Sequence, residues 1–588
     1  MRWIRIAIIA SLPFVFAPPY VLRAHDDGKG IEHSAPAGAN GTGPFSSGGR
    51  VQFLSQVPIL SMGGSSGRLN NDIWGWTDAQ TGRDFALVGR MDGTSFVEVT
   101  DPFNPVYIGN LPSHNGGIAV WRDIKVNGDY AYIVADSIAH GLQIFDLTKL
   151  RSAAPGTTFS NTPGNPDAPN GYHLFHHNSF TSAHNIAINE ETNFAYIAGA
   201  SSPDRGLRFL DLSNPIKPVQ AGVYTHDAQI AIYRGPDTTY DGREIAFNSN
   251  EDTLTIVDVT NKGAPVQLSR TTYPQSRYAH QGWLSSDHQF FFMNDELDEP
   301  SYASTTRTHI WDVRDLENAA YVGYYSASVA SRDHNLYVED GLIYAANYAS
   351  GLRVLDPTVN PATGTPSLTE IGYLDTFATN DNANFDGAWS VYPFFDNGTI
   401  IVNDRQNGLF VARLLKGDTE EDDDVDKTDK LTAIENFTGP SQPLARRRLE
   451  QGSFDGDGDV DNTDLLNAIG NVTGPGGGNL AQESVAIAFA GSLIDRPDHS
   501  DLIYDPLTGN LSIDPSEGPG GILTGYVLGS DDEFNAANHQ THLGGGTPTS
   551  LASELSEQNN GSTVSNIIDL GDVLQTGLTQ IELESLLT

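Results

Sequence analysis

The sequence contains no cysteine among its 588 residues. No disulfide can stabilise the folded chain, so stability has to come from buried apolar area and from any bound metal. Basic residues are also scarce, because 33 Lys and Arg stand against 74 Asp and Glu, a net charge of −41. We therefore exclude nucleic acid as a partner, since its phosphates require a basic surface.

Long apolar runs are missing beyond the N-terminus. Residues 1–24 combine a basic start, an apolar run from Ile6 to Ala17 and a small residue, Ala24, at a cleavage point, which is typical of a secretory signal peptide. No later run could span a bilayer, so we expect a secreted or cell-surface protein without a transmembrane segment in the mature chain. Residues 25–49 are rich in small and polar residues and are expected to form a flexible lead-in.

A repeated pattern of short strands dominates residues 50–415. Residues 334–357, HNLYVEDGLIYAANYASGLRVLDP, contain three short strands joined by turns with Asp, Gly or Ser, and residues 367–376 add a fourth. Seven copies occur at intervals of about 52 residues. Four antiparallel strands that cannot bury both faces alone, recurring along a chain, predict a mainly β protein whose main domain is a β-propeller of about seven blades.

The two ends of the repeat region predict how the ring closes. The seventh copy ends with the strand Gly408–Leu414 and lacks a fourth strand, whereas a lone strand, Arg50–Ile59, precedes the first copy. We expect these two strands to pair, which would remove the free edges of a linear array. The second copy carries an insertion at about residues 151–182, which we expect to be a loop over one face.

Residues 417–440 and 452–475 repeat each other at a spacing of 35 residues, each as an acidic loop followed by a short helix. A calcium loop of this kind supplies oxygen ligands from positions 1, 3, 5, 7 and 12. In the two loops these positions are Asp418, Glu420, Asp422, Asp424 and Asp429, and Ser453, Asp455, Asp457, Asp459 and Asp464. We predict Ca²⁺ as the cofactor of a small α module at 416–475, the alternative being a solvated acidic loop.

The duplicated loop and helix resemble a type I dockerin across residues 416–475. The first loop departs from the pattern with Asp423 where glycine is expected, and the second with Ser453 at position 1. The resemblance implies an EF-hand-like pair that attaches to a cohesin-like protein partner. After a linker, residues 480–588 alternate apolar and polar side chains and predict a small β-rich C-terminal domain.

A second set of candidate residues recurs where each blade's first strand begins. In a propeller this strand lines the central channel, so these side chains would surround one mouth of a funnel. The candidates are Arg122, Asp123, His184, His226, Asp227, His280, His334 and Asp386. They could cap strands by bonding to neighbouring blades, bind a ligand, hold a transition metal or perform acid–base chemistry.

The repeats, with TIVDV at 255–259 and GLRVLD at 351–356, resemble the LVIVD repeat. From about Phe85 to Leu414, with the phrases WRDIKV, SAHNIAIN and YAHQGWL, the chain is similar to the choice-of-anchor B family of exported bacterial proteins. That resemblance implies a secreted or surface propeller joined to a C-terminal sorting or anchoring module. It implies no reaction.

These observations favour a non-catalytic binding or adhesion protein outside the cell, with a surface glycan or a cohesin-like protein as partner. The sequence shows no nucleophile elbow, phosphate loop or zincin helix. The alternative is an enzyme, an extracellular metal-assisted hydrolase or lyase that uses the histidine-lined funnel. Both hypotheses depend on what the first strands of the blades enclose.

Overall fold

The computed structural model describes residues 45–414 apart from 138, 168, 170, 202–206, 223–226, 361–362 and 396, together with seven strands between residues 487 and 572. The predicted signal peptide, the first part of the lead-in and the 416–475 module lie outside the described residues. So do all ten predicted calcium ligands.

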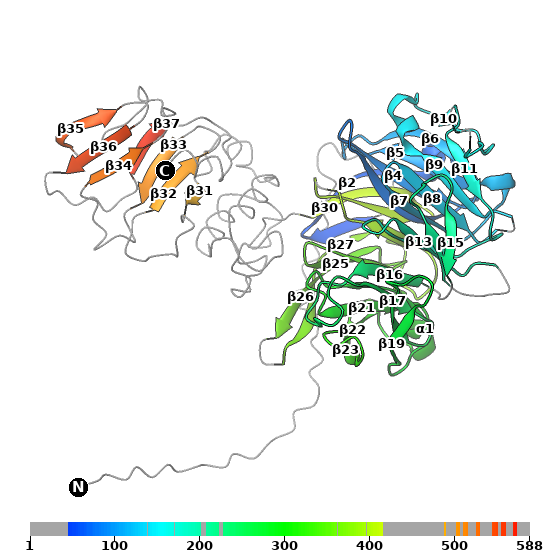
Figure 1. Cartoon of the computed structure of the whole chain (residues 1–588). Coiled ribbons are helices and arrows are strands. Elements are labelled where there is room, and N and C mark those ends of the chain that lie inside the picture. The colour runs from blue at the N-terminus through cyan, green and yellow to red at the C-terminus, as the bar shows by residue number, and fades with distance from the viewer. Residues whose placement is uncertain are drawn as a thin grey trace, which may run out of the picture.

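Seven antiparallel sheets form the blades of a β-propeller (Figure 1). Blades 1 to 4 consist, from the inside outward, of β3 (Asn70–Asp78), β4 (Arg83–Arg90), β5 (Gly93–Glu98) and β6 (Val106–Pro112); β7 (Arg122–Asn127), β8 (Tyr130–Ala135), β9 (Leu142–Asp146) and β11 (Leu174–His177); β12 (Asn185–Asn189), β13 (Phe194–Ala198), β14 (Arg208–Asp211) and β15 (Val219–Gly222); and β16 (Asp227–Ile232), β17 (Glu244–Ser249), β18 (Leu254–Asp258) and β19 (Val266–Thr271).

Blades 5 to 7 follow the same order and complete the ring. They consist of β20 (Ala279–Leu284), β21 (Phe290–Asp295), β22 (Arg307–Asp312) and β23 (Ala320–Ser326); β24 (Asn335–Glu339), β25 (Leu342–Ala346), β26 (Leu352–Asn360), β27 (Thr365–Asp375) and β1 (Ser46–Gly49); and β28 (Ala388–Tyr392), β29 (Thr399–Asp404), β30 (Gly408–Leu414) and β2 (Val51–Val57). Each innermost strand contacts those of both adjacent blades, and β28 contacts β3. The predicted seven-bladed propeller is confirmed.

The ring closes as the sequence predicts. Strand β2 pairs antiparallel with β30, from Val51 opposite Leu414 to Val57 opposite Leu409, and so supplies the fourth strand of blade 7. Strand β1 pairs with the outer edge of β27 in blade 6. The lead-in predicted for residues 25–49 therefore ends before Ser46, because Ser46–Gly49 belong to a sheet.

The insertion in blade 2 differs from the predicted loop, because it contains strands. Leu174–His177 (β11) pair with β9 and supply the fourth strand of the blade. The short strand β10 (Thr157–Thr158) pairs parallel with β6 of blade 1. The insertion thus ties two blades together at the rim.

The core lies between neighbouring blades. Every pair of adjacent blades shares a cluster of buried apolar side chains, such as the one between blades 1 and 2 in which the rings of Phe96 and Phe145 stack 4.8 Å apart. The second and third strands are buried on both faces, as in β4 and β29, which explains their nearly continuous apolar sequences. Burial between blades is what a chain without disulfides has available for its stability.

Few helical residues are described. One short α-helix, α1 (Asp298–Tyr302), follows β21, and 3-10 turns occur at η1 (Ile59–Met62), η2 (His114–Gly116) and η3 (Leu147–Ser152). Within the described part of the chain, no helix has the length and apolar character needed to cross a bilayer.

Seven further strands lie within the predicted C-terminal β domain. Strands β31 (Ile487–Phe489), β32 (Asp501–Asp505), β33 (Asn510–Asp514) and β37 (Ile568–Asp572) form one sheet, and β34 (Gly525–Gly529), β36 (Glu554–Asn559) and β35 (Gly544–Ser550) form another. Because only these strands are described there, a folded domain over 480–588 stays a prediction.

Candidate functional site: the central cavity

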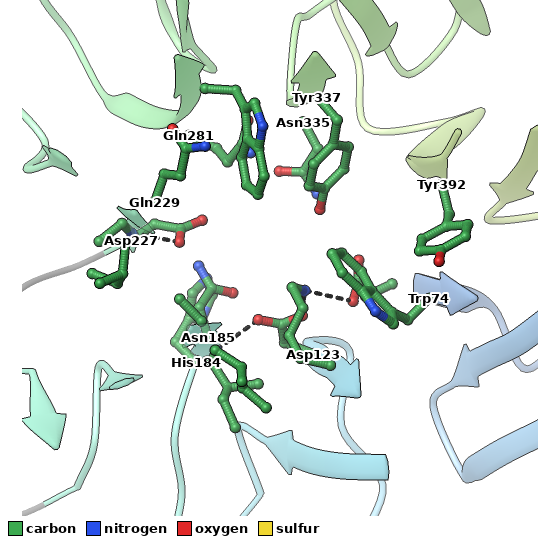
Figure 2. A pocket seen from close by; sticks show the side chains of 18 of the residues that line it. Trp74, Asp123, His184, Asn185, Asp227, Gln229, Gln281, Asn335, Tyr337 and Tyr392 are labelled. Carbon is green, nitrogen blue, oxygen red and sulfur yellow. Dashed lines mark hydrogen bonds and ion pairs between the residues drawn. The ribbon is translucent and has the colours of Figure 1, made fainter. Parts of the chain in front are cut away.

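A cavity of about 290 Å³ lies in the central channel. Its lining comes from the innermost strand of every blade, and Figure 2 shows the labelled side chains surrounding an open centre. This volume is near the lower end of small-molecule sites, which are typically mostly apolar with a few placed polar groups. The cavity therefore has the size and position of a ligand site.

One wall of the cavity is aromatic and comes from blades 5, 6, 7 and 1. Trp74 packs edge-on against Tyr392 at 5.1 Å and against Tyr337 at 5.8 Å between ring centroids, and Trp283 lies 5.0 Å from Tyr337. Phe394 contacts all four of these rings. Such mutually packed rings form a stiff apolar surface with their polar atoms at the edges.

The opposite wall is polar and comes from blades 2, 3 and 4. In Figure 2, Asp227 and Gln229 lie across the cavity from Tyr392 and Trp74, with His184 and Asn185 near them, while Asp123 lies between His184 and Trp74. The cavity thus presents aromatic rings to one side of a ligand and hydrogen-bonding groups to the other. A ligand with one apolar face and several hydroxyl groups would match both walls.

The ammonium group of Lys125 contacts two buried carboxyl groups, those of Asp72 and Asp123. Lys125 Nζ lies 2.5 Å from Asp123 Oδ1, 3.5 Å from Asp72 Oδ2 and 4.5 Å from the centre of the Trp74 ring. Burial raises the pKa of Asp72 far above its usual range, against the attraction of Lys125. For Asp123, Lys125 and several hydrogen bonds outweigh burial and lower the pKa.

Asp227 adds a further carboxyl group to the polar wall. Burial, followed by the charge of Asp123, raises its pKa to about 7. Lys125 offsets the charge of Asp123, and the raised pKa values of Asp72 and Asp227 favour the neutral forms of these two carboxyl groups. This part of the wall therefore carries little net charge, which suits a neutral ligand.

Many polar side chains of the innermost strands bond to the backbone of the next blade. Asp123 Oδ2 accepts the Ile186 amide at 2.6 Å. Comparable bonds join Asp72 to the Ile124 amide, Gln229 to the Leu284 amide, Gln281 to both the amide and the carbonyl of Leu336, His280 to the His334 carbonyl and His334 to the Trp389 carbonyl. The capping interpretation therefore describes these contacts, although the same residues also line the cavity.

The predicted funnel residues are only partly brought together. Arg122, Asp123, His184, Asp227, His280 and His334 line the cavity. The guanidinium of Arg122, however, bonds to the Arg90 carbonyl, Ser113 Oγ and His140, so it joins blades 1 and 2. Asp386 does not line the cavity and accepts instead from Gln406, whereas His226 lies outside the described residues.

The histidines in the cavity wall have different partners. His184 Nδ1 lies 2.9 Å from Asp136 Oδ2, and although burial lowers its pKa, this carboxylate outweighs burial and raises it. His280 and His334 instead lie next to Glu296, with ring centroids 4.3 Å apart. Glu296 was not among the predicted residues because it follows β21, the second strand of blade 5. The acidic run of which it is part, NDELDE at 294–299, was the available signal.

Fold and site together define this protein as a seven-bladed β-propeller whose innermost strands enclose a cavity with one aromatic and one polar wall. Within the propeller, residues 116–148 and 182–226 match the LVIVD repeat. These matches cover the first three strands of blade 2 and all of blade 3. The resemblance to LVIVD repeats is therefore confirmed for this part of the chain.

No curated protein matches the chain. Among solved structures, similar ones are the β-propeller domain of Cps50 (Swd1) from Myceliophteria thermophila, with 9% identity over 56% of this chain and 92% of that one at a TM-score of 0.34; a functionally unknown protein from Desulfotomaculum acetoxidans, with 11% identity, 54% and 87% coverage and a TM-score of 0.35; and a protein from Lactobacillus plantarum, with 13% identity, 57% and 88% coverage and a TM-score of 0.35.

Proposed function

We propose that the protein is an exported, non-catalytic binding protein whose propeller holds a neutral carbohydrate in the central cavity. The observation that carries the proposal is the aromatic wall of Trp74, Trp283 and Tyr337 opposite a wall of carboxyl, amide and imidazole groups. Aromatic rings stack on the C–H face of a sugar, while planar polar groups bond its hydroxyl groups. Because Asp123 offsets the charge of Lys125, a neutral sugar matches this wall better than a phosphate or another anion.

The sequence supports an extracellular setting for this activity. The signal-peptide pattern at 1–24 and the similarity to choice-of-anchor B proteins favour export and retention at the cell surface. The dockerin-like module at 416–475 would attach the propeller to a cohesin-like protein when Ca²⁺ fills its two loops. Without Ca²⁺, the clustered carboxylates would repel one another and oppose folding of the module.

Carbohydrate binding can be tested with a panel of soluble oligosaccharides from cell-wall and extracellular polymers, measured by calorimetry. We expect Trp74→Ala and Trp283→Ala to weaken binding by about tenfold or more, because each removes an aromatic surface worth about 1.5 kcal/mol or more. The control is Tyr172→Ala, an exposed aromatic residue in the blade 2 insertion. Unchanged affinity in both tryptophan variants would contradict the proposal.

The calcium module can be tested separately in the chelator-treated full chain. We expect two equivalents of Ca²⁺ to bind and the helical far-ultraviolet signal to increase, because the loops and helices form together with the metal. Asp457→Ala combined with Asp464→Ala should remove one equivalent. A Ca²⁺ titration that leaves the helical signal unchanged would refute the coupling of metal and fold.

The second candidate function is a metal-assisted hydrolase or lyase acting on an extracellular polymer. It requires a metal centre on the cavity wall, with an open position for substrate. The group of His280, Glu296 and His334 is the observation that favours it. Turnover of an oligosaccharide by the metal-loaded protein, and its loss in Glu296→Gln, would favour this function over plain binding.

A further inference from the structure

Among the residues that the structure describes, one group of three side chains has the spacing of a metal site. One ligand atom each from His280, Glu296 and His334 lies within 4.8 Å of the other two. They come from β20, from the residue after β21 and from the residue before β24, so blades 5 and 6 meet at this point. His280 and His334 line the central cavity.

Hydrogen bonds determine which ring nitrogen of each imidazole carries the proton. His280 Nδ1 lies 3.1 Å from the His334 carbonyl, and His334 Nδ1 lies 2.6 Å from the Trp389 carbonyl. A carbonyl only accepts, so both Nδ1 atoms donate and the lone pair of each neutral ring is on Nε2. Backbone carbonyls that orient imidazoles in this way are the usual outer partners of metal-bound histidine.

Both imidazoles are buried and held by their surroundings. His280 and His334 are 5% and 2% exposed. Their rings pack against each other, and the His334 ring also packs against Trp389, with centroids 4.8 Å apart. Packing therefore fixes the positions of both candidate ligands.

Glu296 faces the imidazole of His334 and also lies in the electrostatic field of Arg332 and Arg405. Its Oε1 lies 3.7 Å from His334 Nε2 and already accepts the Tyr348 hydroxyl at 2.7 Å. Two acceptor atoms thus face each other in a largely buried place, which is unfavourable without a cation or a proton between them. Tyr348 is held for this contact in a left-handed conformation, φ 40°, by two backbone bonds to Ala388.

The neighbouring backbone holds the segments that carry the ligands. Asp333 Oδ2 accepts the Asp295 amide at 3.0 Å, which joins the residue before His334 to the residue before Glu296. Arg332 donates to the Glu296 carbonyl at 2.8 Å. Asp298, Glu299 and Asp333 each have a buried carboxyl oxygen with no hydrogen-bond partner among the described residues, and Arg307 lies 3.4 Å from the other oxygen of Asp298.

We propose that His280, Glu296 and His334 bind one divalent transition metal ion, with zinc as the first metal to test, and leave a fourth position open toward the cavity. Two imidazoles and one carboxylate suit zinc and similar ions, whereas Mg²⁺ and Ca²⁺ prefer oxygen ligands throughout. Three protein ligands with one open position are the arrangement of catalytic rather than structural zinc. His184 does not belong to this group of three.

The test uses the full chain, stripped of metal and kept in excess Ca²⁺ so that the acidic loops are occupied. We expect one equivalent of Co²⁺ to bind, to give the visible absorption of a four-coordinate nitrogen and oxygen site, and to be displaced by Zn²⁺. Glu296→Gln keeps the shape of the side chain and should lower the affinity for Zn²⁺ by about 10–100-fold. His334→Ala should abolish the absorption band.

Two further variants make the outcome specific. His184→Ala removes another cavity histidine and should leave Zn²⁺ affinity unchanged, whereas Tyr348→Phe should weaken it by about tenfold through loss of the bond to Glu296. Thermal unfolding of each variant checks that it is folded. No stoichiometric binding, or binding that survives Glu296→Gln and His334→Ala, would overturn the proposal and leave a protonated Glu296 as the explanation of the contact.

The metal proposal does not depend on carbohydrate binding. Repeating the oligosaccharide titrations with the metal-free protein separates the two, because loss of one activity without the other identifies which proposal has failed.

Discussion

At the scale of single residues, burial rather than residue type decides which groups of the cavity carry charge. Three histidines among the described residues line it. Burial lowers the pKa of His280 and His334, whereas the carboxylate of Asp136 raises the pKa of His184 despite burial. Asp72 and Asp123 likewise diverge around Lys125. A ring of similar side chains thus separates into groups suited to a metal and groups suited to a polar ligand.

Asp227 makes this effect measurable. Its pKa rises to about 7 in the folded protein, so the folded state binds its proton more tightly than the unfolded chain. Its contribution to stability is therefore complete below about pH 4 and is lost as the pH rises to about 7. In Asp227→Asn this loss should disappear. Between pH 5 and pH 8, the free energy of unfolding of the variant should rise by about 1–3 kcal/mol relative to that of wild type. This range is smaller than the full pKa shift implies, because the side chain is only half-buried and solvent screens its charge.

Urea unfolding at both pH values measures that difference. The control is Asp167→Asn, which replaces an exposed carboxylate paired with Lys217. It should leave the urea unfolding curves at both pH values unchanged. Parallel pH profiles for wild type and Asp227→Asn would show that Asp227 is ionised as easily in the fold as in the unfolded chain.

At the scale of elements, the turn acids and the bridging amides explain how a blade is built and joined. Asp146, Asp211, Asp258 and Asp312 each end a third strand and accept the backbone amide two residues later, which starts the turn. Between blades, the Gln281 side chain bonds both the amide and the carbonyl of Leu336 at 2.8 Å. A side-chain amide thereby substitutes for a missing backbone ladder between β20 and β24.

Replacing Gln281 by Ala should therefore destabilise the propeller. It leaves the buried amide and carbonyl of Leu336 without these partners, at a cost of about 1–3 kcal/mol for a buried unsatisfied group. Chemical denaturation gives the free energy of unfolding. Gln267→Ala, at an exposed position of the outer strand β19, should change it by less than about 0.5 kcal/mol. Equal effects of the two substitutions would count against a bridging role.

At the scale of the whole molecule, stability depends on closing the ring. Strand β2 buries Val51 and Phe53 between blades 6 and 7, also buries Leu54, and covers the edge of β30. Each such side chain contributes about 1.5–3 kcal/mol on burial, so the strand contributes on the order of the net stability of a typical domain. Because the chain has no cysteine, no disulfide can close the ring in place of this strand pairing.

Deleting residues 1–57 should accordingly abolish cooperative unfolding and expose β30 to edge-to-edge association. The matched control, a deletion of residues 1–44, retains both β1 and β2 and should unfold like the full chain. Calorimetry and light scattering compare the two. A monomeric, cooperatively folded product of the longer deletion would show that the propeller is stable without its closing strand.

The sequence by itself determined the number of blades and the closing strand. Strand periodicity, turn chemistry and a missing fourth strand are all local signals, and the copies repeat them along the chain. It also indicated the polar positions of the innermost strands, because each copy places them at the same point.

Only the tertiary structure decided which of these positions meet. Residues 174–177, which belong to an insertion, form the fourth strand of blade 2. Glu296, at the end of another strand, lies close to His280 and His334. The Arg122 guanidinium donates to the Arg90 carbonyl, and Asp386 accepts from Gln406. Which side chains face each other across the channel depends on how the seven sheets are rotated about one axis. Packing between blades sets that rotation, and the sequence of a single blade does not.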